Sequence, residues 1–219
     1  MLPLRDIIPS RTTPYVTVTL IVLNALAWFY EVSMPRGQLT EFLQAYGVVP
    51  AAFIPSTLLT SMFLHGGWSH VIGNMWYLWI FGDNVEDRLG HGRFVVFYLL
   101  CGIVAAFGQI LMNPDSTLPT IGASGAIAGV MGAYLVLYPH SRVLTLIPLI
   151  IYWEIIELPA IFLLGFWFLM QLFSAGAIAV TASTGGGGVA FMAHVAGFLT
   201  GVLGVFAFRK KQQPDTWWA

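Results

Sequence analysis

The sequence predicts an all-α membrane protein, a bundle of six transmembrane helices. Hydrophobic residues make up 58% of the 219-residue chain and charged residues only 9%, too few charges for an ordinary soluble domain. Apolar runs of about 20 residues, the length that crosses a bilayer, recur along the chain. The net charge of −1 does not indicate nucleic-acid binding, so none is expected.

Six apolar runs are the predicted spans, and together they form one domain at residues 15–208. The first run follows Pro14 and lacks an Ala-x-Ala cleavage site, so we interpret it as a retained span rather than a signal peptide. A short lead at 1–14 precedes the domain and a tail at 209–219 follows it. The predicted spans are residues 15–32, 69–88, 93–112, 124–138, 159–177 and 189–208.

Three connections between the spans have distinct characters. Residues 34–68 contain three prolines and no lysine, and apolar pairs recur there at helix-like spacing, at 53/54, 58/59 and 62/63. We therefore expect part of this connection to lie in the membrane interface. Residues 140–158 are an apolar link broken by proline, and residues 181–188 are a flexible loop ending in four glycines.

Positive charge predicts how the chain is oriented in the membrane. Six spans place both termini on one side, and eight of the nine Lys and Arg residues then share that side, with only Arg36 opposite. By the positive-inside rule both termini are cytoplasmic. Ser124 consequently begins its span from the outer side.

A serine flanked by glycines opens the fourth span, in the sequence Gly122-Ala123-Ser124-Gly125. Glycine lets another backbone or a substrate approach the hydroxyl closely. The helix start supplies unpaired backbone N–H groups, which suit negative charge. A nucleophile and an oxyanion donor can therefore come from one turn. The alternative is that these are merely small residues that let membrane helices touch.

His194 is predicted to lie at the same depth as Ser124. Each residue begins a 15-residue stretch that ends at the cytoplasmic boundary. Such a stretch covers about 22 Å of the roughly 30 Å hydrocarbon core. Small residues on both spans, including the pair Gly197 and Gly201 on the face of His194, favour close approach of the two helices. The histidine can then serve as a base; the alternative is a structural histidine bonded to a neighbouring helix.

His70 and Asn74 lie one helical turn apart in the second span, with Asn74 near the predicted depth of Ser124. Side-chain donors at that depth suit an oxyanion, although Asn and His also form interhelical hydrogen bonds in membranes. His65 is expected to be a structural residue in the outer loop.

Neither a third catalytic residue nor a metal site is evident. None of the ten acidic residues falls inside the fourth or sixth predicted span, so the sequence favours a Ser–His dyad. The histidines do not form an HExxH pattern and Cys101 is the single cysteine, so neither a metal site nor a disulfide is expected.

Together these motifs resemble the rhomboid intramembrane serine proteases. The resemblance covers residues 56–208 and includes Val85-Glu86-Asp87-Arg88-Leu89-Gly90 after the second span. It implies that Ser124 is the nucleophile, that His194 is the general base, and that His70, Asn74 and the Ser124 N–H form the oxyanion hole. Gly122 and Gly125 would shape the active-site loop, and Gly197 and Gly201 would support helix packing.

The chain departs from the family pattern at two places. Ala128 stands where some members carry a tyrosine stacked on the catalytic histidine, which leaves open what orients His194. Many members also carry a Trp-Arg pair in the first outer loop, and none occurs between residues 34 and 68, which leaves the anchoring of that loop open.

The resemblance implies an endopeptidase that cuts single-pass membrane proteins in the bilayer and needs no cofactor. We expect a multi-pass protein of a bacterial or archaeal cell membrane. A catalytically inactive rhomboid-like protein that binds membrane segments is the alternative. A small transporter or channel is a further alternative. It predicts polar lining on several spans and often an internal repeat, but the sequence shows no repeat and its polar groups converge on the second, fourth and sixth spans.

The fifth span and the loop 181–188 are predicted to be the moving gate, beside a rigid site on the fourth and sixth spans. This span is rich in bulky side chains and lacks a GxxxG seam, which indicates looser packing. The alternative is that the glycines of the loop are merely a connector.

Overall fold

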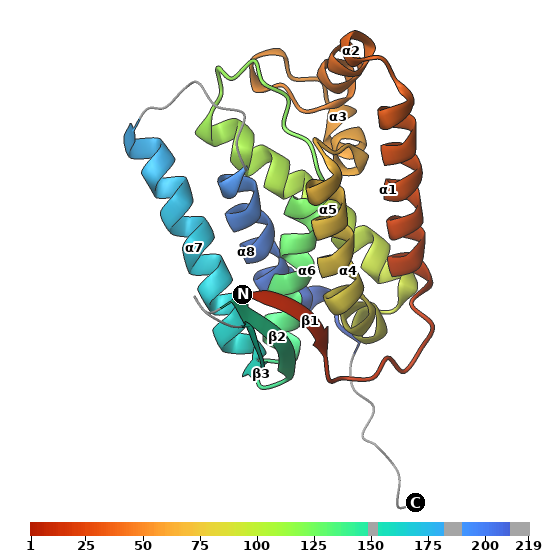
Figure 1. Ribbon diagram of the computed structural model, residues 1–219, viewed down its shortest axis with the longest axis vertical. Helices are drawn as coiled ribbons and strands as arrows, with labels where there is room; N and C mark the ends of the chain where they lie inside the picture. Colours follow the sequence, from red (N-terminus) through yellow and green to blue (C-terminus); the bar gives the residue numbers. More distant parts are fainter. Residues whose placement is uncertain (149–152, 182–189, 211–219) are drawn as a thin grey trace, which may run out of the picture.

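The computed structural model describes residues 1–148, 153–181 and 190–210. Within them, a bundle of helices carries a small sheet at one end (Figure 1). The long helices coincide with the six predicted spans to within a few residues. They are α1 (Tyr15–Ser33), α4 (Trp68–Leu89), α5 (His91–Met112), α6 (Ser124–Leu137), α7 (Ala160–Thr181) and α8 (Phe191–Phe208). The predicted glycine loop begins where α7 ends, and its residues 182–188 lie outside the described residues.

Four helices of the described chain are long and apolar enough by composition to cross a membrane: α1, α5, α7 over Ala160–Ala177, and α8. The helix α6 is apolar but has only 14 residues. The helix α4 has 22 residues, but polar and charged side chains interrupt it. These helices make the chain an integral membrane protein.

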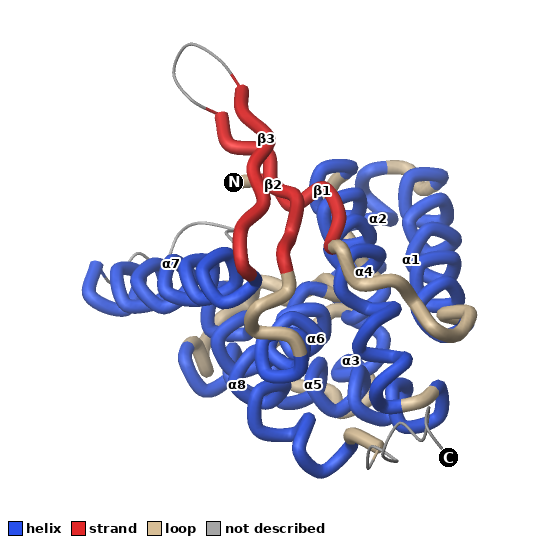
Figure 2. Tube along the Cα trace, turned by 90° about the horizontal axis from the view of Figure 1, so that it is seen from below, coloured by secondary structure: helices blue, strands red, loops and turns tan. Residues whose placement is uncertain are grey.

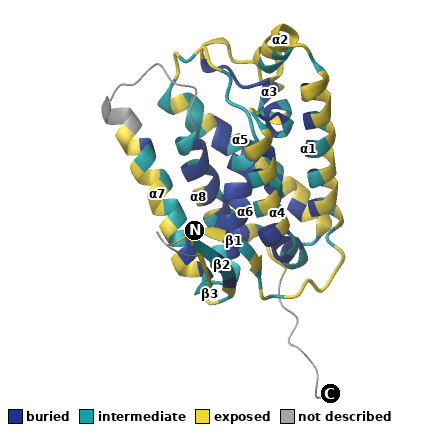
Figure 3. Ribbon diagram, in the orientation of Figure 1, coloured by how far each residue is buried: buried dark blue, intermediate teal, exposed yellow. Residues whose placement is uncertain are grey.

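The helix α6 is the centre of the bundle, and every residue from Gly125 to Tyr134 in it is buried (Figure 3). Glycines bring it against α8. A Cβ on Gly197 would overlap the carbonyl of Gly125, and a Cβ on Gly201 would overlap the carbonyl of Gly129. The predicted close packing of the fourth and sixth spans is therefore confirmed, and it fixes the spacing of the side chains that face each other across the seam.

A three-stranded antiparallel sheet corrects the prediction of an all-α fold. Its strands are β1 (Leu2–Asp6), β2 (Arg142–Pro148) and β3 (Trp153–Pro159), in the order β1-β2-β3. The link expected at 140–158 is largely a hairpin, which projects from the helices in Figure 2. Its short alternation, with Val143 and Thr145 buried, lies within a largely apolar link and does not stand out as a strand pattern. The strand β1 lies in the N-terminal lead, and its partner is far along the chain.

The connection between α1 and α4 is more helical than predicted. It contains α2 (Arg36–Tyr46), the 3₁₀ turns η1 (Pro50–Ala52) and η2 (Ser61–Phe63), and the short helix α3 (Thr57–Thr60). The apolar pairs at 58/59 and 62/63 fall in α3 and η2, as their spacing indicated. The helix α2 was not predicted, although Leu39, Phe42, Leu43 and Tyr46 recur at the i, i+3, i+4, i+7 spacing of an apolar helix face; none of its residues is buried.

The start of α1 is capped by a side chain of α4. Pro14 precedes α1 and supplies no cap, but the buried carboxylate of Glu86 accepts the backbone N–H groups of Val16 and Thr17 at 2.9 and 2.8 Å. It also accepts the Thr17 hydroxyl at 2.7 Å. A carboxylate at a helix N-terminus satisfies unpaired donors and the helix dipole together. Glu86, which belongs to the motif Val85-Glu86-Asp87-Arg88-Leu89-Gly90, therefore ties α1 to α4.

Candidate active site

Ser124 and His194 face each other across the glycine seam. Ser124 is the first residue of α6 and His194 lies in the first turn of α8. The Nε2 atom of His194 is 2.8 Å from the Ser124 Oγ, although the two residues are 70 positions apart. The imidazole is 8% exposed, so it is held in a largely water-excluded position. The structure thus brings together the two residues for which the sequence predicted equal depth.

A glutamine on α7 holds the other nitrogen of His194. The Nδ1 atom lies 2.8 Å from the Oε1 of Gln171. An amide oxygen only accepts, so the proton of neutral His194 sits on Nδ1 and leaves Nε2 to accept from the serine hydroxyl. The sequence prediction of a two-residue site missed Gln171 because only acidic residues were considered as the third member. Its signal was a long polar side chain in an otherwise largely apolar span.

Two donors converge below the loop that precedes Ser124. The Gly66 N–H donates to His70 Nδ1 at 3.3 Å, so the proton of neutral His70 is on Nε2. That nitrogen faces Gly122, where a Cβ would lie only 2.7 Å from it. Gly122 has a φ of 121°, a conformation that favours glycine. The loop can therefore pass close to the His70 donor only because residue 122 has no side chain.

His65 positions the amide of Asn74. The Asn74 Nδ2 donates to His65 Nε2 at 3.0 Å, and Asn74 also lines the cavity beside Ser124. His65 is 1% exposed and its backbone N–H donates to the Glu31 carboxylate at 3.1 Å. Burial, and then the nearby His70, lower the pKa of His65 to about 4, which keeps the ring neutral and able to accept. The geometry fits the structural role expected for His65.

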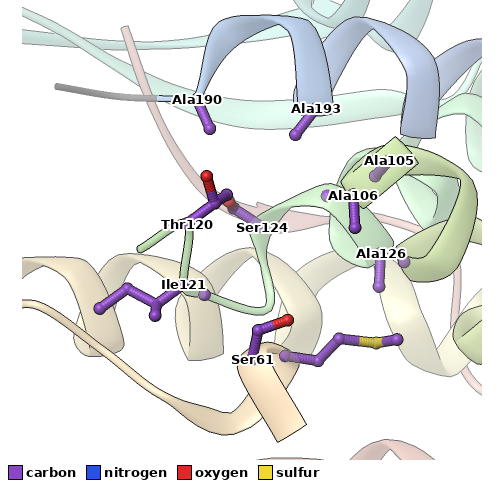
Figure 4. A pocket seen from close by; sticks show the side chains of 13 residues that line it. Ser61, Ala105, Ala106, Thr120, Ile121, Ser124, Ala126, Ala190 and Ala193 are labelled. Carbon is purple, nitrogen blue, oxygen red and sulfur yellow. The ribbon is translucent and has the colours of Figure 1, made fainter. Parts of the chain in front are cut away.

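A cavity of about 1170 Å³ lies over these groups. Its lining comes from α4, α6, α7, α8 and the connection before α6, and includes His70, Asn74, Tyr77, Ser124, Trp167 and His194. A separate pocket of about 30 Å³, the size of a water molecule, lies on another side of Ser124. Figure 4 shows Ser124 and Thr120 of this pocket beneath Ala190 and Ala193 at the start of α8. The serine is thus accessible from one large cavity between helices.

Comparison with protein families identifies the chain. The model of the rhomboid domain matches residues 55–211. The chain belongs to the rhomboid family. The rhomboid protease GluP of Bacillus subtilis is 35% identical over 133 residues, which are 59% of this chain and 26% of GluP. The putative rhomboid protease YdcA of the same species is 30% identical over 128 residues, 57% of this chain and 63% of YdcA.

Relatives of this rhomboid also occur in organelles. Rhomboid protein 1, mitochondrial, of Saccharomyces cerevisiae is 31% identical over 110 residues, 48% of this chain and 32% of that protein. Each of these matches covers less than two thirds of the relative's own length. Because the relatives are bacterial and mitochondrial, the comparisons do not support the expected assignment to a bacterial or archaeal cell membrane.

The two departures from the rhomboid pattern have local substitutes. Ala128 is buried in α6, and the ring beside His194 is instead Trp167 of α7, with centroids 5.7 Å apart and planes at 34°. The connection between α1 and α4 lacks the Trp-Arg pair, but Val48 and Thr120 exchange backbone hydrogen bonds of 3.0 and 2.8 Å. That bridge anchors the connection to the segment leading into Ser124.

Proposed function

We propose that this rhomboid is an intramembrane serine endopeptidase that cleaves single-pass transmembrane proteins with a Ser124–His194 dyad. The observation that carries the proposal is the 2.8 Å contact of the serine Oγ with a histidine nitrogen whose ring partner, Gln171, leaves it free to accept a proton. A serine activated in this way is the requirement for acyl-enzyme chemistry.

The reaction uses groups already in place. Ser124 Oγ attacks the scissile carbonyl while its proton moves to His194 Nε2, and the C–O bond forms as the carbonyl π bond opens. The negative oxygen is received by the Ser124 N–H, His70 Nε2–H and Asn74 N–H, donors that stabilise a developing oxyanion. His194 then gives its proton to the leaving amine as the C–N bond breaks. Water, deprotonated by His194, attacks the acyl-enzyme carbonyl, and the proton returns to Ser124.

We propose six spans, α1, α4, α5, α6, α7 and α8, with both termini cytoplasmic. The ends of α4, α5 and α8 support this, because Lys210 N–H donates to the Arg88 carbonyl at 3.0 Å and Arg93 donates to the Phe208 carbonyl at 3.4 Å. Cationic residues from three helices therefore gather at one end, as the positive-inside rule requires of a cytoplasmic face. The 14 residues of α6 span about 21 Å, so Ser124 begins below the outer boundary of a core about 30 Å thick.

Substrates reach the serine between α4 and α7 in this proposal. The main cavity is lined by both helices, and the outward side of α7 is apolar, with Phe162 and Phe173 well exposed. A transmembrane helix hides its carbonyls in hydrogen bonds, so it must unwind locally before Ser124 can attack. The cavity can receive the unwound segment and the water that resolves the acyl-enzyme.

Reconstituted enzyme tests the function. Purified protein in liposomes is incubated with a panel of single-pass segments, and products are identified by mass spectrometry. Wild type is expected to cut within or beside the outer half of a segment, and Ser124→Ala to cut none. Binding of segments without cleavage by wild type would instead show the inactive segment-binding rhomboid.

A further inference from the structure

The helix α7 contributes a polar contact to His194 in addition to lining the cavity. Gln171 and Trp167 lie one turn apart on α7, and both meet the imidazole. The amide stands in a window of α7 with mean hydropathy 1.8. A polar side chain at such a place is costly unless it is hydrogen-bonded, and the described partner of its oxygen is the His194 ring.

The tautomer of His194 decides whether it can be a base. With the proton on Nδ1, the lone pair of Nε2 faces the Ser124 hydroxyl. With the proton on Nε2, the ring presents a donor to the serine and cannot take its proton. In apolar surroundings, an Nδ1–H without an acceptor is itself unfavourable, so removing the acceptor both shifts the tautomer and frees the ring to rotate.

We propose that Gln171 is a positioning residue that holds His194 in the tautomer and orientation needed to activate Ser124. The proposal rests on the proposed function of the dyad. Gln171 does not touch the reacting atoms; it accepts the Nδ1–H bond, and Trp167 limits rotation of the ring. Because both residues are on α7, displacement of that helix withdraws the two contacts together, so the dyad is complete only when α7 is packed against α8.

Packing between α7 and α8 supports this coupling. Phe168 of α7 stacks on Phe198 of α8, with centroids 4.7 Å apart and planes at 22°. Phe168 lies next to Trp167 in sequence, and Phe198 lies one turn after His194. The aromatic stack therefore sets the position of α7 at the level where Gln171 must meet the imidazole.

Three substitutions test whether Gln171 acts as a hydrogen-bond acceptor or only as a packing side chain. Gln171→Met keeps the length of the side chain and removes the acceptor. Gln171→Glu keeps an acceptor oxygen, whether ionised or protonated. Leu172→Met introduces the same methionine one position along, where the side chain is 46% exposed toward lipid, and serves as the matched control.

The expected results follow from the tautomer. Gln171→Met should lower kcat about 10–100-fold, the loss typical when the partner that orients a metal-ligating histidine is removed, with KM within about threefold. Gln171→Glu should retain kcat to within about fivefold of wild type. Leu172→Met should match wild type.

The measurements are kcat and KM on a membrane segment in liposomes, the labelling rate by a fluorophosphonate, and ¹⁵N NMR of labelled histidine, which reads the tautomer without activity. Wild type should show His194 protonated at Nδ1, and Gln171→Met should lose that signal. The positioning role is overturned, while the dyad stands, if the probe labels wild type but the kcat of Gln171→Met equals that of wild type. It is also overturned if Gln171→Glu loses as much kcat as Gln171→Met. If wild type itself is not labelled, the proposed function fails and this role fails with it.

Discussion

At the scale of single residues, one hydrogen bond determines the chemistry of each histidine near the serine. The Gly66 N–H assigns His70 as a donor at Nε2, the Asn74 amide assigns His65 as an acceptor, and Gln171 assigns His194 as a base. All three assignments follow from which partner is able only to donate or only to accept. The site is therefore preorganised by neutral partners, and no described carboxylate is hydrogen-bonded to Ser124 or His194.

Substitution of Asn74 tests whether this side chain acts in catalysis, which lowers kcat, or in substrate binding, which raises KM. Asn74→Ala should lower kcat about 10²–10³-fold, the usual effect of removing one oxyanion donor, and should change KM little. The remaining donors, His70 and the Ser124 N–H, can reduce the loss toward the lower figure. Steady-state kinetics in liposomes measure it, with Ile72→Ala on the lipid-exposed side of α4 as the control. A raised KM at unchanged kcat would make Asn74 a packing residue.

The sequence predicted the proximity of Ser124 and His194, because the signal of these two residues is positional. Ser124 and His194 stood out because counting from the cytoplasmic boundary placed them at one depth, and glycines marked the seam between them. Gln171 lies in a span without such a glycine seam, so no positional signal paired it with His194. Gln171 is also not acidic, but its amide oxygen accepts from His194 Nδ1 as a carboxylate would.

At the scale of elements, α4 links the first helix to the site. It caps α1 through Glu86 near its C-terminal end and carries His70 and Asn74 toward its N-terminal end. The long helices were predictable because a span needs about 20 apolar residues, and that run is visible without tertiary information. The strands were not, because β1 and β2 pair residues as far apart as Leu2 and Leu146.

Removing the cap should loosen α1. Glu86→Ala leaves the N–H groups of Val16 and Thr17 without their buried acceptor, at a cost of about 1–3 kcal/mol in the free energy of unfolding. Glu157→Ala is the matched control, because its pair with Arg142 is on the surface and should contribute less than about 1 kcal/mol. Denaturant titration in micelles compares the two variants. Equal unfolding midpoints would show that Glu86 is not the cap of α1.

The helix α7 should act as the gate for substrates and also hold His194 in position through Gln171 and Trp167. A cleavable disulfide-containing cross-linker between engineered cysteines in the outer turns of α4 and α7 should suppress cleavage of a membrane segment, and reductant should restore it. The same cross-linked enzyme should still react with a small fluorophosphonate, because Gln171 and Trp167 remain on His194. Cleavage at the uncross-linked rate would place substrate access elsewhere.

At the scale of the whole molecule, the sheet and the bundle are joined by Asp6. Its carboxylate accepts the Tyr134 hydroxyl of α6 at 2.7 Å and the Asn84 amide of α4 at 3.1 Å. Burial raises the pKa of Asp6 from 3.8 to about 6, with a smaller contribution of the same sign from Asp83. The N-terminal strand is thus fastened to the central helix by a group that titrates under mildly acidic conditions.

The pH dependence of stability tests the raised pKa of Asp6. A carboxyl whose pKa is raised on folding contributes stability below its unfolded pKa, and that contribution is lost as pH rises through the folded pKa. The melting temperature of wild type relative to Asp6→Asn should therefore fall between about pH 4 and pH 6 and level off above that range. Thermal melts of both proteins in detergent measure the difference. A difference that is constant or rises with pH would contradict the burial of Asp6 against α6.

The architecture as a whole agrees with family membership over residues 55–211, and the proposed chemistry depends on one serine within it. Covalent labelling with a fluorophosphonate, followed by mass spectrometry of the modified peptide, tests that dependence most directly. Folded wild type should carry the adduct on Ser124, Ser124→Ala should carry none, and His194→Ala should fold but lose nearly all labelling. Equal labelling of wild type and Ser124→Ala would contradict the dyad.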